Sequence, residues 1–267
     1  MAVNRTASAG RIQLQIDDVV ATVTLDHPGR LNAITVAMWG ELRDIFQHLS
    51  AQAGLRCVVV RGAGGHFAAG ADIHEFPQVR VDLDRTMAYH RQTIAPALQA
   101  VADCAHPVVA AIEGVCVGGG LEIASRCDLR LAARGARFGA PINRLGFPMA
   151  PNEMRGLLEL AGRAVTLEIL LEGRVFDADE ALAKRLLTRV VAADALEAEL
   201  HATVARLCAG APRAARLNKS TAARLMADPA PLSDAEWRAC FAYAEGPDHR
   251  QGVQAFLQGT DPVFTGE

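Results

Sequence analysis

The first half of the chain alternates short apolar segments with segments of helical periodicity, and this alternation restricts the fold more than any other feature. Residues 11–28 predict a hairpin of two strands around an Asp-Asp turn, and Thr35 is placed to cap a helix over 36–52. CVVVRG (57–62) and PVVAAIEG (107–114) predict buried strands, with a helix over 86–104 between them. This order predicts parallel strands joined by helical crossovers.

Beyond residue 150 the strand pattern almost disappears. Helical periodicity is found in four segments, which span 163–173, 177–187, 195–210 and 212–228. The sequence therefore predicts an α/β core followed by a helical C-terminal region. We place the division between 1–200 and 201–267.

Composition sets limits on partners and compartment. The 267 residues are 51% hydrophobic and 21% charged, as in ordinary globular proteins, and the net charge of −3 gives no basis for nucleic acid or an anionic membrane as the main partner. No apolar run is long enough for a membrane helix, and MAVNRTASAGR at the N-terminus lacks the apolar stretch of a secretory signal. Six dispersed cysteines without a C-x-x-C pair favour reduced thiols in the cytoplasm over a metal site or a disulfide set.

Two glycine-containing segments follow the two buried strands. They are RGAGGHFAAGADI (61–73) and EGVCVGGGLEIA (113–124). Ligands of open α/β sheets bind beyond the carboxyl ends of the strands, and small residues there let a ligand approach the main chain. Backbone N–H groups of Ala71 and Gly119 are candidates to stabilise an oxyanion. A phosphate loop is disfavoured because neither segment matches its motif, and tight turns without a ligand remain the alternative.

These segments also carry a family resemblance. HFAAGADI (66–73) together with VAAIEGVCVGGGLEIASRCDL (109–129) resembles the crotonase superfamily of enoyl-CoA hydratases and isomerases. LDHPGRLNAIT (25–35), LLEGRVFDADEALAKRLLTRVV (170–191) and AFLQGTDPVFTG (255–266) resemble further family segments. The resemblance thus extends over nearly the whole chain.

The resemblance implies a fold, an assembly and a chemistry. It implies a β-β-α spiral core that binds acyl-CoA, with a helical C-terminal region that closes the CoA pocket and forms homotrimers or hexamers built as dimers of trimers. It also implies that the N–H groups of Ala71 and Gly119 hold the thioester oxygen of an enolate, while Glu122 moves the proton. Coenzyme A is carried by the substrate, so neither a metal nor a separate cofactor is expected.

The implied coenzyme A contacts are less specific. Arg30 falls where a basic residue of the family meets the CoA phosphates, although a solvated surface charge is the alternative. Lys219 and Phe256 resemble C-terminal residues that reach CoA, in some cases from a neighbouring subunit, with structural or surface roles as the alternative. The adenine and pantetheine path corresponds to a short strip consisting of Ala69, Ala71, Asp72 and Ile73.

One departure from the family pattern bears on the mechanism. Hydratases of the family use two glutamates, and Glu122 matches the first, but Ile142 stands where the second is expected. Glu122 with its water would then serve both steps in turn, and we expect either a slow hydratase or one whose substrate supplies its own proton chemistry. Glu153, in FPMAPNEMRG (147–156), is a candidate auxiliary acid, although a solvent-facing position at a helix N-terminus is favoured. We interpret His90 as structural and Asn143 as a cap of its turn.

The leading hypothesis is therefore an enoyl-CoA hydratase. Isomerisation, dehydration, decarboxylation and thioester hydrolysis use the same enolate stabilisation, so they remain alternatives. A catalytically weak acyl-CoA-binding protein is the alternative from another class. The acyl chain is not specified, although several apolar residues are candidates for its pocket: Phe76, Met87, Tyr89, Phe147 and Met149.

Overall fold

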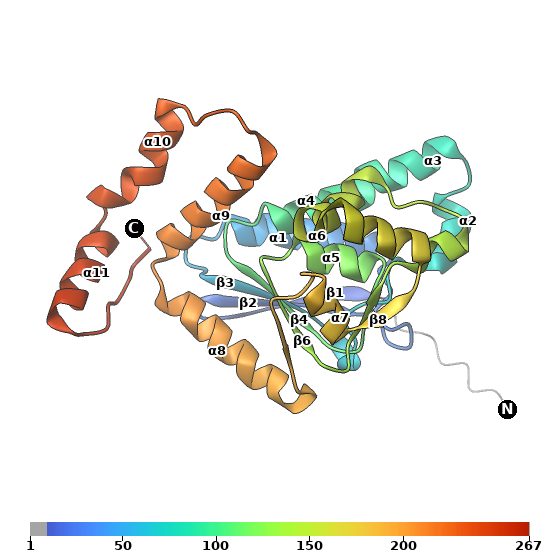
Figure 1. Ribbon diagram of the computed structural model, residues 1–267, viewed down its shortest axis with the longest axis horizontal. Coiled ribbons are helices and arrows are strands. Elements are labelled where there is room, and N and C mark those ends of the chain that lie inside the picture. Colours follow the sequence, from blue (N-terminus) through green and yellow to red (C-terminus); the bar gives the residue numbers. More distant parts are fainter. Residues whose placement is uncertain (1–9, 267) are drawn as a thin grey trace.

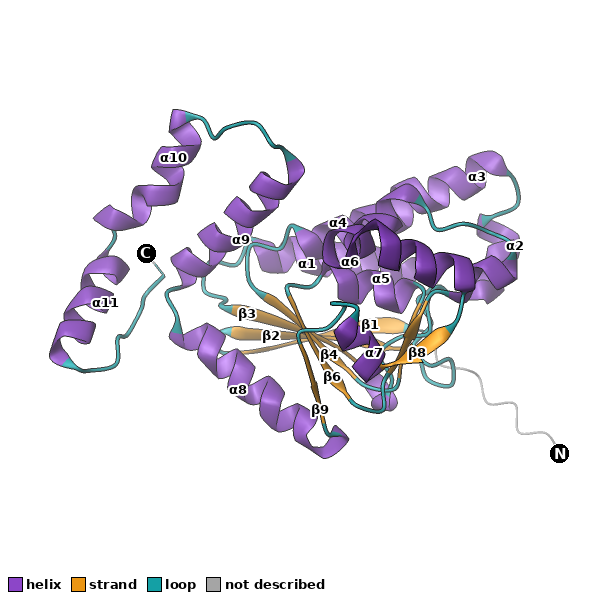
Figure 2. Ribbon diagram, viewed as in Figure 1, coloured by secondary structure: helices purple, strands orange, loops and turns teal. Residues whose placement is uncertain are grey.

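The computed structural model describes residues 10–266, so nearly all of the N-terminal segment for which no secretory signal is expected lies outside the described residues. A six-stranded sheet forms the centre of the molecule (Figures 1 and 2). Its strands, in spatial order, are β1 (Arg11–Asp17), β2 (Val20–Asp26), β3 (Cys57–Gly62), β4 (Val108–Ile112), β6 (Leu129–Ala133) and β9 (Arg189–Val191).

The pairing of these strands follows the sequence pattern. β1 and β2 form an antiparallel hairpin, with Arg11 opposite Asp26. β2, β3, β4, β6 and β9 are then parallel to one another, which requires the helical crossovers expected from the order of elements. The predicted hairpin, both buried strands and the α/β class are confirmed. β6 and β9 were not predicted.

A second, three-stranded sheet supports the glycine segments. It consists of β5 (Val115–Val117), β7 (Arg137–Gly139) and β8 (Val175–Asp177). A bridge between Ala68 and Cys116 joins this sheet to the first glycine segment, and a bridge between Ile34 and Ala71 joins that segment to the chain before the first helix. Both glycine segments are thereby fixed against each other.

Helices cover both faces of the large sheet. One face packs against α1 (Val36–Ser50), which Thr35 caps as predicted, and against α4 (Ala95–Ala102). The other face packs against Leu196 and Leu200 of α8 (Leu196–Ala209). In Figure 1, α5 (Gly119–Arg126) and α6 (Pro151–Glu172) lie on the same side as α1 and α4.

The last three helices extend away from the sheet, at the left of Figure 1. They are α9 (Pro212–Ala227), α10 (Asp234–Phe241) and α11 (Pro247–Gln258). The helical C-terminal region is confirmed, and the expected division at residue 200 falls within α8, which packs on the core. No helix in the described part of the chain is both long enough and apolar enough to cross a membrane.

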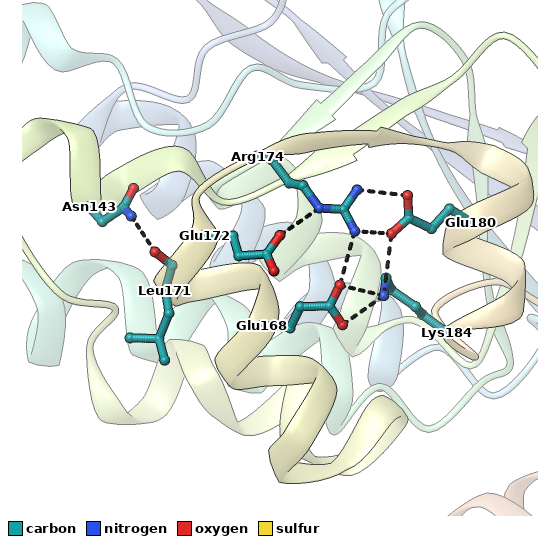
Figure 3. Close-up of polar contacts among 7 residues, drawn as sticks. All are labelled: Asn143, Glu168, Leu171, Glu172, Arg174, Glu180 and Lys184. Carbon is teal, nitrogen blue, oxygen red and sulfur yellow. Dashed lines mark hydrogen bonds and ion pairs between the residues drawn. The ribbon is translucent and has the colours of Figure 1, made fainter.

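The C-terminal end of α6 is held by polar contacts, which Figure 3 displays. Arg174 forms ion pairs with Glu168, Glu172 and Glu180, which join α6 to the start of α7 (Ala178–Ala183). Asn143 Nδ2 donates a 2.9 Å hydrogen bond to the carbonyl oxygen of Leu171. Asn143 therefore binds the end of α6, so the segment around residue 142 is tied to this helix.

Candidate active site

Glu122 lies in the first turn of α5 and is buried, with 6% of its surface exposed. Gly118 precedes the helix with φ 50° and ψ −122°, a conformation that glycine adopts without a steric penalty. The chain thus turns sharply from β5 into α5 and directs Glu122 inward. Burial raises the pKa of Glu122 well above 4.5, the negative charge of Glu153 raises it further, and Arg80 opposes both effects.

The two candidate oxyanion donors lie side by side. A Cβ atom placed on Gly119 would lie 3.2 Å from the backbone nitrogen of Ala71 and 3.1 Å from the ring of Trp39. A side chain at this position would push these neighbours back by a few tenths of an ångström, so glycine favours the approach. Neither N–H donates a hydrogen bond to another described residue, which leaves both available to a ligand. Two converging free N–H groups are the arrangement that stabilises a developing oxyanion.

Both donors and Glu122 line one cavity of about 100 Å³. The strip residues Ala69 and Ile73 also line it, and so does Ile142. Ile142 presents an apolar side chain to the cavity, so position 142 contributes no proton-transfer group. The remaining lining side chains include three aromatic or charged groups, Phe76, Arg80 and Phe147, and a second carboxylate, Glu153.

Glu153 is buried in this cavity, so the solvent-facing interpretation was wrong. It lies in the first turn of α6, is 4% exposed, and its Oε1 lies 2.5 Å from Nδ1 of His90. His90 belongs to a π-helical segment, Tyr89–Ile94, which joins α3 (Leu83–Ala88) to α4. π-Helical segments are rare in proteins, and those that occur are often found at functional sites. His90 also lines an adjoining cavity of about 590 Å³.

The site thus places two buried carboxylates on the walls of one small cavity with two free backbone N–H groups. Burial and the neighbouring Glu153 carboxylate raise the pKa of Glu122, which suits Glu122 to proton transfer near neutral pH. A substrate whose carbonyl oxygen becomes negative would find donors for that oxygen and an acid–base group beside it.

Comparison with known proteins agrees with this chemistry. The model of the enoyl-CoA hydratase/isomerase family matches residues 15–267. The chain belongs to this family. It is 32% identical to a probable enoyl-CoA hydratase of Mycobacterium bovis over 95% of this chain and 97% of the relative. It is 28% identical to the (E)-benzylidenesuccinyl-CoA hydratase of Thauera aromatica over 96% of this chain and 99% of the relative.

Solved structures of the enoyl-CoA hydratase/isomerase family have the same fold. The crystal structure of an enoyl-CoA hydratase/carnithine racemase from Magnetospirillum magneticum superposes with a TM-score of 0.94 at 46% identity, covering 98% of this chain and 97% of that one. A putative family protein from Hyphomonas neptunium gives a TM-score of 0.90 at 32% identity, covering 96% and 98%. The crotonase-like fold is confirmed.

Several residues assigned to coenzyme A by family resemblance do not line the catalytic cavity. Arg30 is exposed, and its Nη1 lies 2.8 Å from the ring of His74. Asp72 caps the short helix at 73–75 by accepting a hydrogen bond from the backbone N–H of His74. Their contacts with coenzyme A stay predictions.

Lys219 and Phe256, the two C-terminal residues assigned to coenzyme A, lie outside the catalytic cavity. Lys219 forms a 2.8 Å ion pair with Asp128 and donates a hydrogen bond to the carbonyl oxygen of His106. Phe256 is 85% exposed on α11 and lines a separate cavity between the C-terminal helices. Within one chain neither residue reaches the catalytic cavity, so a CoA contact would require a neighbouring subunit.

Sequence reasoning underestimated His90 and did not single out Arg80. Both lie in segments without a family motif, and their partners lie far away in the sequence. Of the apolar residues expected to line the acyl pocket, Phe76, Phe147 and Met149 line the two cavities. Met87 is exposed.

Proposed function

We propose that this protein is an enoyl-CoA hydratase in which Glu122 and Glu153 act as the two proton-transfer groups. The observation that supports this proposal is the burial of both carboxylates in the cavity lined by Ala71 and Gly119. Glu153 would then replace, from α6, the glutamate absent at Ile142. Its burial next to Glu122 also argues against a protein that only binds acyl-CoA, since buried carboxylates are costly without a use.

In the proposed reaction, ionised Glu122 takes a proton from water while the water oxygen bonds to the β-carbon of the enoyl thioester. The electron pair of the double bond moves toward the thioester, and the N–H groups of Ala71 and Gly119 hold the oxygen of the resulting enolate. Glu153 then gives its proton to the α-carbon. A proton passing from Glu122 to Glu153 restores the starting state. Coenzyme A arrives with the substrate, and the proposal includes no metal or redox group.

The raised pKa of Glu122 supports its role as the base. A general base is most effective when its pKa lies near the operating pH, and burial moves the pKa of Glu122 in that direction. His90 is proposed as a positioning residue, because its ring fixes the carboxyl group of Glu153 through Nδ1.

Crotonyl-CoA turnover tests the proposal, followed as loss of the ultraviolet absorbance of the enoyl thioester. We expect Glu122→Gln to lower kcat by about 10² to 10⁴ while the affinity for butyryl-CoA, a saturated analogue, changes little. Glu159→Gln is the matched control because Glu159 lies on α6 with an exposed side chain. Turnover that survives Glu122→Gln would contradict the assigned roles, and conversion of a 3-enoyl-CoA without hydration would favour an isomerase.

We also propose that the protein assembles as a homotrimer or as a hexamer of two trimers and acts in the cytoplasm. The assembly is supported by exposed apolar side chains on the C-terminal helices, which include Trp237, Phe241, Phe256 and Leu257. Light scattering coupled to size-exclusion chromatography tests the assembly, and a monomer at micromolar concentration would contradict it.

A further inference from the structure

Arg80 is held between aromatic rings beside the catalytic cavity. It directly follows α2 (Phe76–Val79), and its guanidinium carbon lies 3.8 Å from the centre of the Phe76 ring and 4.3 Å from that of Phe147. The ring of Tyr89 lies 5.4 Å away. Rings on these sides fix the plane of the guanidinium through cation–π contacts.

The guanidinium has unused hydrogen-bonding capacity. Its Nε is buried without a hydrogen-bond partner, and none of the ion pairs among the described residues includes Arg80. Buried polar groups normally have partners, because a donor left unpaired costs about 1–3 kcal/mol and more when it is charged. The unpaired Nε is therefore available to a partner from outside the chain.

The position of Arg80 indicates where that partner comes from. The catalytic cavity and the adjoining cavity of about 590 Å³ share one wall, formed by Ile73, Phe76, Arg80, Leu145 and Phe147. Arg80 is the only arginine or lysine among the described residues that line either cavity. An acyl chain whose thioester oxygen is held at Ala71 and Gly119 lies in the same cavity as the guanidinium.

The charges around Arg80 admit a competing role. Burial lowers the pKa of Arg80, and the nearby Tyr89, Glu153 and Glu122 oppose that effect. Arg80 could therefore act only as a counterion of the two carboxylates. However, no carboxylate oxygen of either glutamate approaches within ion-pair distance of its nitrogens. A planar fork of N–H donors left free in this way matches the two oxygens of a further carboxylate.

We propose that Arg80 binds a free carboxylate on the acyl group, so that the preferred substrates are 2-enoyl thioesters of dicarboxylic acids. This inference rests on the proposed hydratase function, because it takes these thioesters to be substrates. Recognition of the carboxylate does not itself require turnover. The aromatic rings hold the guanidinium plane, and the apolar wall around it strengthens the attraction between the two charges.

Binding of saturated thioesters tests the recognition separately from catalysis. Isothermal titration compares butyryl-CoA with succinyl-CoA and glutaryl-CoA, which carry a terminal carboxylate and no double bond to hydrate. We expect the wild-type protein to bind at least one carboxylated thioester about tenfold more tightly than butyryl-CoA. Arg80→Met should abolish this preference and Arg80→Lys should retain part of it, since a lysine keeps the charge without the fork. Arg85→Met, which removes an exposed arginine of α3, is the matched control and should keep the preference.

The outcomes separate the two proposals. Equal binding of all three thioesters by the wild type, or an equal weakening of all three by Arg80→Met, would overturn the role of Arg80 and favour the counterion. Turnover of crotonyl-CoA and of glutaconyl-CoA, its carboxylated counterpart, completes the test. A binding preference that persists without turnover of either would support Arg80 and refute the hydratase. Turnover of crotonyl-CoA without a binding preference for the carboxylated thioesters would support the hydratase and refute the role of Arg80. If both proposals hold, Arg80→Met raises KM for glutaconyl-CoA about tenfold more than KM for crotonyl-CoA.

Discussion

Glu153 Oε1 lies 2.5 Å from Nδ1 of His90, 63 positions away in the sequence, and this contact places an acid–base group in a cavity whose expected second glutamate is an isoleucine. A carboxylate in its ionised form only accepts hydrogen bonds, so the proton of this contact lies on Nδ1 whenever Glu153 is ionised. The contact thereby fixes the orientation of the carboxyl group, and an ionised Glu153 fixes the tautomer of the imidazole.

Removal of the Glu153 carboxyl group should affect catalysis more than folding. We expect Glu153→Gln to lower kcat for crotonyl-CoA by about 10² to 10⁴, since a general acid is lost while the hydrogen bond from His90 can persist to the amide oxygen. Steady-state kinetics with Glu159→Gln as control provides the measurement. A Glu153→Gln enzyme with unchanged kcat would show that Glu122 serves both steps.

The positioning role of His90 predicts a different pattern. His90→Phe should lower kcat by about tenfold and shift its pH profile, because Glu153 loses its fixed donor. His90→Asn keeps an N–H donor near the position of Nδ1 and should recover part of the activity. A purely structural role would lower thermal stability in both variants and leave the pH profile unmoved.

A carboxylate restored at position 142 should compensate for the loss of Glu153. In the Glu153→Gln background, we expect Ile142→Glu to recover kcat by about tenfold, because residue 142 lines the same cavity wall. Ile142→Gln in that background is the matched control and should recover nothing. Recovery by both variants, or by neither, would contradict the view that Glu153 stands in for the missing acid.

The raised pKa of Glu122 predicts a pH-dependent cost in stability. Above pH 4.5 the folded state holds a proton on Glu122 that the unfolded chain has released, so this group stabilises the fold at low pH and its contribution is lost as the pH rises toward the raised value. Glu122→Gln should therefore raise Tm, by on the order of 2 °C at pH 8, and by less near pH 4.5. Thermal unfolding across this range measures the difference, and a gain that is independent of pH would contradict the prediction.

The glycine triplet should tolerate no side chain at its third position. A Cβ atom on Gly120 would lie 2.3 Å from the carbonyl oxygen of Ala68, so Gly120→Ala must separate α5 from the first glycine segment. We expect loss of turnover and a fall in stability of at least about 2 kcal/mol. Gly40→Ala is the matched control within α1, where a Cβ meets nothing within 4 Å, and should stabilise the protein by about 0.5–1 kcal/mol. Chemical denaturation of both variants gives the comparison.

The architecture around the glycine segments could be predicted because it depends on residues that are close together in the sequence. Buried strands followed by glycines give both the parallel sheet and the position of Gly119 beside Ala71, and the spacing from Gly118 gives the place of Glu122. The three-residue strands β7, β8 and β9 were not predicted, since three residues are too few to display a period of two.

The roles of His90, Glu153 and Arg80 depend on contacts between distant segments. The prediction that Glu153 faces solvent rested on its position at the start of a helix. The helix dipole favours an acid in the first turn whether or not that acid faces solvent. His90 reaches Glu153 only because the segment Tyr89–Ile94 lies beside the first turn of α6 in the folded chain. Similarly, the sequence around Arg80 does not indicate its role, because the ring of Phe147, in the segment before α6, contacts it only in the folded chain.

The interruption of α6 at Gly162, where φ is 71° and ψ is 176°, has a consequence for selectivity. Glu153 belongs to the half of the helix before this glycine, whereas Asn143 fastens the Ile142 wall to the half after it. The bend at Gly162 therefore lies between the part of α6 that carries the acid and the part to which the wall is attached. We expect a change in the backbone conformation at Gly162, which lines neither cavity, to alter the width of the catalytic cavity without a change in any lining side chain.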